Sequence, residues 1–277
     1  MWSTEKAVYK YRVDPEVYMA AKRSNVVDVV PKVIHHVYVS LDPISKLGPH
    51  SVSKTPPERL GNGICVRSCR VTYNPGYKYV LWGDKEIYDF LVQNNYTWFL
   101  ELYNSYPYPI SRVDSLKYLI LYHHGGIYLD LDDVCLGNFD SLLRYDVFAT
   151  KSDPFGFFND FFGARPRHPF FKQLVEQLPR YNRWYVLPYL NVMLSAGPLY
   201  YMVQYGLYPE KSERMANLFN STWHLQTGRC GGGAWHTRET LLVYHVYDHS
   251  FRYLLLVAVV CLSTLVYCLY RRGTCNC

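Results

Sequence analysis

The chain has 277 residues, 49% of them hydrophobic and 17% aromatic, and a formal net charge of +6. This length predicts one sizeable domain with appendages, and the aromatic content suits a globular core and a carbohydrate-facing surface. The charge is compatible with a nucleotide diphosphate or an anionic membrane as partner, and also with a solvated basic surface. Without an arginine-rich arm or C-x₂-C zinc spacing, nothing indicates nucleic-acid binding.

The first thirty residues are predicted to form a polar lead-in with short helical character. Their charged side chains argue against an N-terminal signal peptide; these are Glu5, Lys6, Lys10, Arg12, Asp14, Lys22 and Arg23. The first core strand is predicted over residues 33–39, VIHHVYV.

Strands and helices then alternate, which predicts a parallel or mixed α/β sheet. Residues 42–63 have no apolar period and form a loop, either an acceptor flap or a disordered segment. The next predicted elements are a strand over 77–82, a helix from a capping Asp84 to Val92, a short helix over 98–103 and a break at 106–109.

The central helix is predicted to follow this break. Ser111 and Asp114 have the spacing of a capping box. Residues at helical spacing continue as far as Gly125, a type of residue that commonly ends a helix; they are Leu116, Leu119, Ile120 and His123. Residues 127–132, IYLDLD, alternate with a period of two and predict a strand.

This alternation places two acids on one face of the predicted strand. Tyr128, Asp130 and Asp132 lie opposite Leu129 and Leu131. Two neighbouring carboxylates cannot both be buried unpaired, because each would cost several kcal/mol. Carboxylate oxygens suit Mg²⁺ or Mn²⁺, which usually hold substrate phosphates as well, so the pattern predicts a divalent metal site.

A solvated turn at Asp130, Asp132 and Asp133 is the alternative, and for an isolated D-x-D it is the better interpretation. The context favours the metal site. A helix that carries Asp114 and Lys117 one turn apart, followed by two glycines and by acids at a strand end, is a much rarer arrangement.

Residues 111–140 resemble the core motif of the DXD-containing glycosyltransferase family of fungal α-1,6-mannosyltransferases and inositolphosphoceramide mannosyltransferases. The glucosyltransferase domain of large clostridial toxins shares this core more distantly. The family pattern is roughly [SA]-D-x-x-R-x-x-x-L-x-x-x-G-G-x-Y-x-D-x-D, and it is matched by Asp114, Leu121, Gly125, Gly126, Tyr128, Asp130 and Asp132. Lys117 replaces the family arginine, which keeps the charge but loses the bidentate fork.

The resemblance implies a GT-A type, Rossmann-like α/β fold that binds a nucleotide-sugar at the carboxyl ends of its strands. It implies retaining glycosyl transfer, with Asp132, and Asp130 directly or through water, holding Mn²⁺ or Mg²⁺ against the diphosphate. Asp114 is expected to bind sugar hydroxyls, Lys117 to balance Asp114 or to touch the diphosphate, and Tyr128 to lie in the same donor site.

Two further pairs of donor-binding residues follow from the resemblance. Val37 and Tyr38 fall where the toxin-type domains place nucleobase contacts, and Tyr38 is expected to stack on the base; packing in the core is the alternative. Asn159 and Asp160 match the family's N-D-x-x-x-x-x-P-x-H-P-F segment, where the Asn lies near the donor sugar; an ordinary turn is the alternative.

In the second half a strand is predicted over 146–150 and a helix from His168-Pro169 to Leu178, with His168 structural. Residues 181–200 resemble the lipid-directed branch, which carries N-W-F-L-P-Y and then S-x-G-P. Four arginines of this half face either a phosphoinositol head group or solvent; they are Arg165, Arg167, Arg180 and Arg183.

Residues 231–236, GGGAWH, resemble the family's late G-S-S-W-H phrase. In this fold the metal commonly takes one ligand from the C-terminal part of the domain, which implies His236, with His224 as the second candidate. The glycines would let this loop approach a diphosphate closely.

The hydrophobic maximum, residues 253–270, contains no charge and is bounded by Arg252 and by Arg271-Arg272. It predicts a single transmembrane helix near the C-terminus; a buried core helix is the alternative. The family implies a Golgi or other endomembrane location with a lumenal catalytic domain, which agrees with Arg271-Arg272 in the cytosol. Tail anchoring without a signal peptide would instead leave that domain cytosolic, so its orientation stays open.

Six of the eight cysteines fall into three pairs. Cys65 and Cys69 are candidates for pairing in an oxidising lumen, or else free thiols. Cys261 and Cys268 lie in the apolar span, and the following Cys275 and Cys277 are candidates for palmitoylation.

The sequence thus predicts a lead-in over 1–30, a GT-A domain over 31–250, and a transmembrane helix with a short basic tail over 251–277. The predicted reaction transfers mannose from GDP-mannose, preferred over a UDP-sugar, to an inositolphosphoceramide-like membrane lipid. One alternative is transfer of another hexose from a UDP- or GDP-sugar to a protein glycan or another lipid. The other, motivated by Lys117, is a membrane-anchored nucleotide-sugar-binding protein without turnover.

Overall fold

A computed structural model describes residues 12–13, 27–39, 46–51, 67–151, 156–218, 227–229 and 249. The chain divides into two compact units, Met1–Val186 with Leu190–Gly233, and Leu187–Tyr189 with Ala234–Cys277. All but four of the described residues belong to the first unit. No helix in the described ranges is long and apolar enough to cross a bilayer, and residues 253–270 lie outside them.

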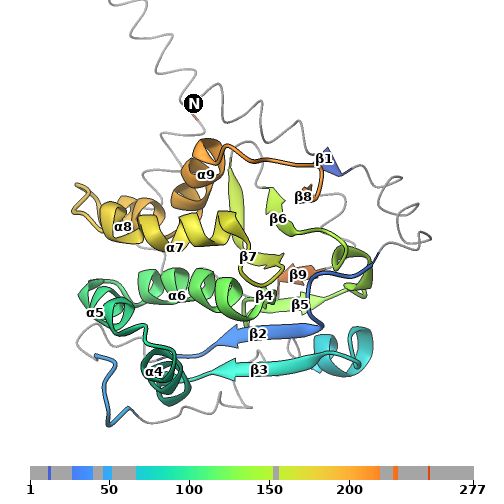
Figure 1. Cartoon of the computed structure of the whole chain (residues 1–277), viewed down its shortest axis with the longest axis horizontal. Coiled ribbons are helices and arrows are strands. Elements are labelled where there is room, and N and C mark those ends of the chain that lie inside the picture. The colour runs from blue at the N-terminus through green and yellow to red at the C-terminus, as the bar shows by residue number, and fades with distance from the viewer. Residues whose placement is uncertain are drawn as a thin grey trace, which may run out of the picture. The chain divides into compact units, whose positions relative to one another are not determined.

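A seven-stranded mixed sheet with the order β1-β8-β6-β7-β4-β2-β3 forms the centre of the first unit (Figure 1). β2 pairs in parallel with β3 and β4, and β7 runs antiparallel between β4 and β6. The strands are β1 Arg12–Val13, β2 Val33–Val37, β3 Lys78–Trp82, β4 Gly126–Leu129, β6 Val147–Lys151, β7 Phe157–Ala164 and β8 Met215–Leu218. The predicted mixed α/β sheet is confirmed, and β1 adds a strand from within the polar lead-in.

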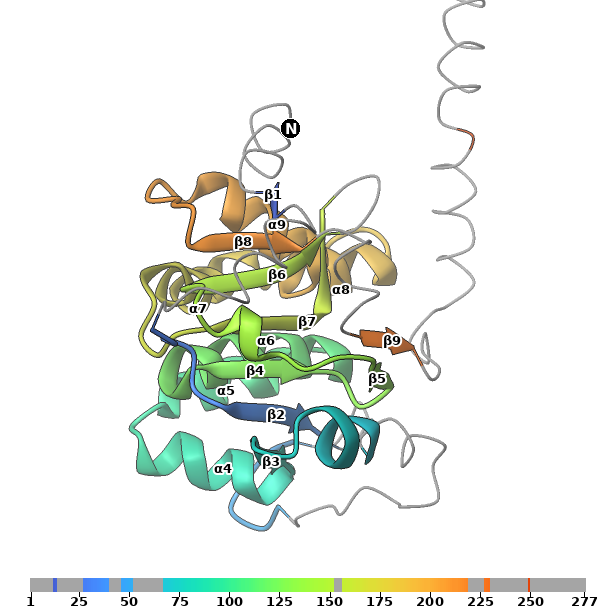
Figure 2. The same ribbon diagram turned by 90° about the vertical axis from the view of Figure 1, so that its right-hand side faces the viewer.

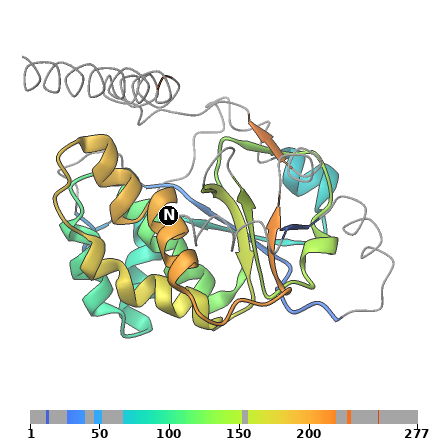
Figure 3. The same ribbon diagram turned by 90° about the horizontal axis from the view of Figure 1, so that it is seen from above.

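Helices cover one face of this sheet, and the π-helical segment η1 and strand β5 lie on the other (Figure 3). The helices are α4 Asp84–Gln93, α5 Thr97–Ser105, α6 Pro109–His124, α7 Pro169–Tyr181, α8 Pro188–Ser195 and α9 Pro198–Leu207, with η1 at Ser68–Tyr73 and a 3₁₀ turn η2 at Asp140–Leu142. Each face of the sheet therefore has its own hydrophobic core.

Strand β4 connects the two cores because its side chains alternate. Tyr128 is buried in the core on the helical face, while Ile127 and Leu129 are buried in the other. The strand ends at Leu129, so the prediction that Asp130 and Asp132 continue its alternation is wrong. The chain turns there because the backbone N–H of Asp133 donates to the carbonyl oxygen of Asp130 at 3.2 Å.

The central helix α6 begins three residues earlier than predicted, and the capping box at Ser111 is wrong. Pro109, whose fixed φ suits a first helical position, starts the helix, and Ser111 is a buried residue within it. The predicted stop at Gly125 is confirmed. Its φ is +65°, and a Cβ there would lie 2.5 Å from Pro166, so only glycine fits without strain.

Other predicted elements match within one or two residues, namely β2, β3, α4, α5, β6 and the start of α7. Asp84 does not cap α4: Gly83 is the N-cap residue and Asp84 lies in the first turn. His168 is structural as predicted, because its ring nitrogen Nδ1 accepts from the N–H of Phe170 at 3.1 Å and caps α7.

Candidate active site at the carboxyl end of β4

The antiparallel strand β7 brings Asn159 and Asp160 to the end of β4. Leu129 pairs with Phe161, and the N–H of Asp130 donates to the carbonyl oxygen of Asp160 at 2.9 Å. The start of an antiparallel strand lies beside the end of its neighbour. Asn159 and Asp160 are therefore part of a strand, and the alternative of an ordinary turn is wrong.

Helix α6 supplies an ion pair to the same place. The Lys117 ammonium lies 2.7 Å from the Asp114 carboxylate, and both side chains are almost fully buried. Asn159 joins them: its side-chain amide donates to Asp114 at 2.9 Å, and its carbonyl oxygen accepts from Lys117 at 2.5 Å. Asn159 thus forms one hydrogen-bonded group with Lys117 and Asp114, which lie 42 and 45 residues before it in the sequence.

Two aromatic rings enclose the Lys117 ammonium, with the ring centres of Tyr128 and Phe162 at 4.7 and 5.7 Å. Burial alone would lower the pKa of Lys117, but the carboxylates of Asp114 and Asp130 outweigh it and raise that pKa. Lys117 therefore keeps its charge. It balances Asp114, the first of its two predicted roles.

Asp130 stands where carboxylates crowd together. Its Oδ1 accepts from the Tyr128 hydroxyl at 2.6 Å. Removal from water raises the pKa of Asp130 to about 7; Lys117 opposes this rise, whereas the charges of Asp160 and Asp132 add to it. A further cation at this point would relieve the repulsion between the carboxylates.

The donor set fits Mg²⁺ or Mn²⁺. Asp130 and the following Asp132 supply hard oxygen ligands, and these ions commonly use one or two carboxylates and take their other ligands from substrate phosphates and water. Among the residues that the structure describes, no group of three or more His, Cys, Asp or Glu side chains is placed to hold a metal ion. His236 and His224 lie outside those residues.

The predicted nucleobase contacts lie at the same edge of the sheet. β2 and β4 are parallel, so their carboxyl ends coincide. Val37, the last residue of β2, is buried in the helical core, while the half-buried Tyr38 continues the pairing by donating its N–H to the Trp82 carbonyl oxygen at 2.9 Å. Tyr38 is the more accessible of the two.

His36 has a role at this site that the sequence pattern did not predict. Its ring Nδ1 donates to the carbonyl oxygen of Leu129 at 2.7 Å, directly before Asp130, and burial lowers the pKa of His36 to about 4. A neutral imidazole thus fixes the end of β4. The signal was present, since a histidine in a strand covered on both faces must find a hydrogen-bond partner.

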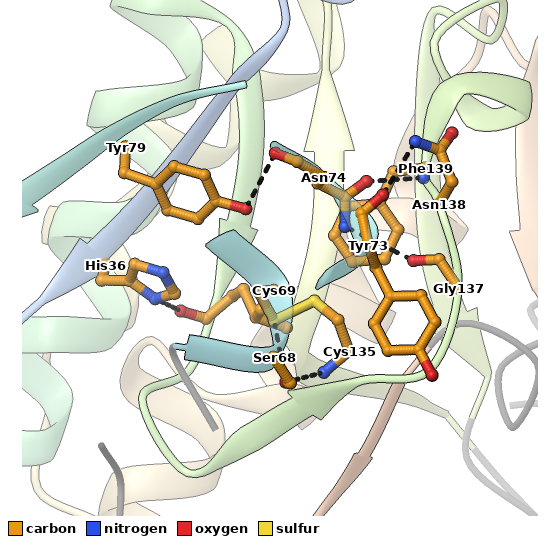
Figure 4. Close-up of a disulfide and its surroundings, with 11 residues drawn as sticks. His36, Ser68, Cys69, Tyr73, Asn74, Tyr79, Cys135, Gly137, Asn138 and Phe139 are labelled. Atoms are coloured by element: carbon orange, nitrogen blue, oxygen red, sulfur yellow. Dashed lines mark hydrogen bonds between the residues drawn. A yellow bond between two sulfur atoms is a disulfide. The ribbon is translucent and has the colours of Figure 1, made fainter. Parts of the chain in front are cut away.

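A disulfide between Cys69 and Cys135 closes the other side of the acidic turn (Figure 4). The predicted pairing of Cys65 with Cys69 is therefore wrong. Both bonded cysteines are fully buried, although 66 residues separate them in sequence. Cys135 is the last residue of β5, Asp133–Cys135, so the chain is covalently anchored just after the acids.

Hydrogen bonds extend this connection, and together with the disulfide they form a clasp between residues 68–74 and 135–139 (Figure 4). They are Cys135 N to Ser68 Oγ at 3.0 Å, Phe139 N to Asn74 Oδ1 at 2.9 Å and Asn138 Nδ2 to the Tyr73 carbonyl oxygen at 3.0 Å. The acidic turn is thus held at both ends, by β4 before it and by the clasp after it.

Strand β9, Thr227–Arg229, reaches the same turn from late in the sequence (Figure 2). It pairs antiparallel with β5 and places Arg229 opposite Asp133. The segment that contains the glycine-rich phrase begins immediately beyond this strand.

Comparison with known proteins agrees with this site. Residues 63–149, which contain the acidic turn, match the family model described as glycosyltransferase sugar-binding region containing DXD motif. The chain is similar to mannosyl phosphorylinositol ceramide synthase SUR1 of Saccharomyces cerevisiae, with 38% identity over 65% of this chain and 43% of that protein. Among solved structures, the PaToxG glycosyltransferase aligns with 73% of this chain and 76% of its own at 15% identity and a TM-score of 0.47, which does not establish a common fold.

The chain spans less than half the length of several curated relatives: the matches cover 43%, 46% and 45% of three of them. Inositol phosphoceramide mannosyltransferase 1 of Schizosaccharomyces pombe is covered more fully, with 33% identity over 87% of this chain and 73% of that protein. The chain therefore belongs to the DXD-containing glycosyltransferase family that includes the inositol phosphoceramide mannosyltransferases.

Proposed function

We propose that this protein is a metal-dependent, retaining glycosyltransferase that transfers mannose from GDP-mannose to inositolphosphoceramide. The names of its relatives support the sugar and the acceptor. The observation that carries the proposal is the group at the end of β4, where Asp130 and Asp132 follow a strand and the buried Asp114–Lys117 pair lies beside them. A GT-A type domain agrees with the parallel strands β2, β3 and β4, whose carboxyl ends meet at that group.

The metal would be held by Asp130 and Asp132. His236 remains the proposed third ligand. A bound Mn²⁺ or Mg²⁺ would neutralise the negative charge that develops on the leaving diphosphate.

The chain's own residues orient the donor. Lys117 and Asn159 hold Asp114 in place, which leaves its carboxylate fixed for hydrogen bonds to sugar hydroxyls. Tyr38 offers its ring to the nucleobase at the same sheet edge. The acceptor hydroxyl attacks from the side of the departing diphosphate, and its proton passes to that diphosphate.

We place the catalytic domain in the lumen of the Golgi or another endomembrane compartment. The buried Cys69–Cys135 disulfide supports this side, because such bonds form and persist in oxidising compartments. A transmembrane helix over residues 253–270, with Arg271-Arg272 in the cytosol, would anchor the domain there.

The test offers detergent-solubilised protein radiolabelled GDP-mannose, and separately UDP-sugars, with membrane lipids and Mn²⁺. We expect labelled mannosylinositol phosphorylceramide and release of GDP. Release of UDP would establish another hexosyltransferase. Nucleotide-sugar binding without transfer to any acceptor would establish the non-enzymatic binding protein, and either result would overturn the proposal.

A further inference from the structure

The loop that leaves α7 exposes two large apolar side chains close together in sequence. Trp184 is 73% exposed and Val186 is 81% exposed, more than any other large hydrophobic residue that the structure describes except Val27. Figure 1 shows this loop, between α7 and α8, at one end of the helical layer. Single exposed apolar residues are ordinary, but a Trp and a Val at one loop tip indicate a surface that meets something apolar.

The exposure is fixed by the loop's own hydrogen bonds. The side chain of Asn191, itself buried, holds Tyr185 at both backbone groups: Oδ1 accepts from Tyr185 N at 2.9 Å, and Nδ2 donates to Tyr185 O at 2.5 Å. Asn182 Nδ2 donates to Ser105 Oγ of α5 at 2.7 Å. With Tyr185 held in this way, Trp184 and Val186 are directed away from the protein.

Two guanidinium groups accompany the apolar tip. Arg180 and Arg183 are both exposed, and Arg183 Nε donates to the Arg180 carbonyl oxygen at 2.6 Å. In the described part of the chain no salt bridge involves either arginine. Trp beside basic residues is the arrangement found where a protein enters the head-group region of a bilayer, with the ring at the interface and guanidinium groups on phosphates.

We propose that residues 180–186 form a membrane-docking loop, with Trp184 and Val186 inserted among lipid head groups and Arg180 and Arg183 on their phosphates. A lipid surface fits better than a protein partner because the apolar tip is small and the flanking charge is of one sign. Docking itself is independent of catalysis. Its use, delivery of a lipid acceptor out of the membrane, rests on the proposed function.

The test uses the full chain reconstituted in bilayers that contain anionic phospholipid with brominated acyl chains, which quench tryptophan on contact. We expect the quenched part of the fluorescence to fall substantially in Trp184→Phe. Trp98→Phe, which removes a partly exposed tryptophan on α5, is the matched control and should leave it unchanged. Equal quenching of wild type and Trp184→Phe would overturn the proposal. A dimer that Trp184→Ser abolishes would overturn it as well, because the loop would then be covered by a second copy of the chain.

A second measurement removes the charge. Arg180→Gln with Arg183→Gln should lower the docked population, read from Trp184 quenching, by up to about fivefold per arginine in anionic bilayers and little in zwitterionic ones. An identical loss in both bilayers would contradict phosphate recognition. Because fluorescence requires no turnover, these results remain readable even if GDP-mannose transfer is never observed, and in an active protein the same variants should raise the KM for the lipid acceptor but not for the donor.

Discussion

The two ends of strand β4 are both lined with buried polar side chains, but they are satisfied in opposite ways. At the amino end the His35 ring lies between two neutral groups: its Nδ1 accepts from the Trp82 indole at 3.1 Å, and its Nε2 donates to the Gly125 carbonyl oxygen at 2.9 Å. Burial lowers the pKa of His35 to about 3, so the ring is neutral. Each nitrogen has one partner, and the arrangement is complete.

At the carboxyl end, beside the neutral His36, the ionisable side chains are predominantly acidic. Lys117 balances Asp114, while the charges of Asp132 and Asp160 oppose ionisation of Asp130. Buried groups satisfied by neutral partners stabilise a fold, whereas clustered carboxylates in restricted water are characteristic of sites that bind a cation or a substrate. By this comparison the polar side chains at the amino end of β4 stabilise the fold, and those at the carboxyl end are the candidates for binding a cation or a substrate.

The largest expected effect is at the acidic end. Asp132→Asn keeps the shape of the side chain but removes the charged ligand, so glycosyl transfer should fall by roughly 100-fold or more. Radiolabel incorporation into lipid measures it. Asp89→Asn, an exposed acid of α4, is the matched control and should retain full activity. Undiminished transfer by Asp132→Asn would contradict a catalytic role for the acidic end of β4.

A substitution in the Asp114–Lys117 pair tests whether the stability of the acidic end depends on the balance between its buried charges. Lys117→Met leaves the Asp114 carboxylate buried without its cation, which should lower the free energy of unfolding by about 3–5 kcal/mol. Chemical denaturation of the detergent-solubilised protein measures it. Lys85→Met, which breaks the exposed pair with Asp89, should leave stability unchanged, and equal behaviour of both variants would contradict the buried ion pair.

The clasp provides the next test. Cys69→Ser, or reduction of the native protein, should lower the free energy of unfolding by about 2–5 kcal/mol and loosen the acidic turn. Cys65→Ser should have no effect, because Cys69 is bonded to Cys135. Peptide mapping without reductant that recovered Cys65 joined to Cys69 would contradict this connectivity.

The amino end predicts a pH-dependent effect that is smaller than the preceding ones within any single pH unit. Because the pKa of His35 is lower in the folded protein than its usual value of 6.5, the unfolded chain binds the extra proton, and stability present above pH 6.5 is lost as the pH falls toward 3. The loss is on the order of 1 kcal/mol per pH unit in that window. Denaturation at several pH values should show a flatter profile for His35→Gln, and an unchanged slope would contradict a neutral buried His35.

Local pattern predicted much of the fold. Helical spacing of apolar residues predicted α6 as far as Gly125, and the residue types of 33–39 and 77–82 predicted β2 and β3 within two residues. Local rules failed where two of them competed. Ser111 has the spacing of a cap, but Pro109 two residues earlier already begins the helix.

Features formed by segments that are distant in the sequence could not be predicted from local pattern. The Cys69–Cys135 bond joins residues 66 apart, and the position of Asn159 beside Asp114 depends on the register of β7 against β4. The family motif placed Asp114, Lys117 and Asp130 together only by resemblance. Their hydrogen-bonded geometry required the tertiary structure.

The most direct test is a crystal structure of the protein with Mn²⁺ and GDP, with the metal located by its anomalous signal. We expect one Mn²⁺ bound by the carboxylates of Asp130 and Asp132 and by the diphosphate of GDP. A diphosphate bound at another place, with Asp130 and Asp132 in contact only with water, would contradict the metal-dependent mechanism.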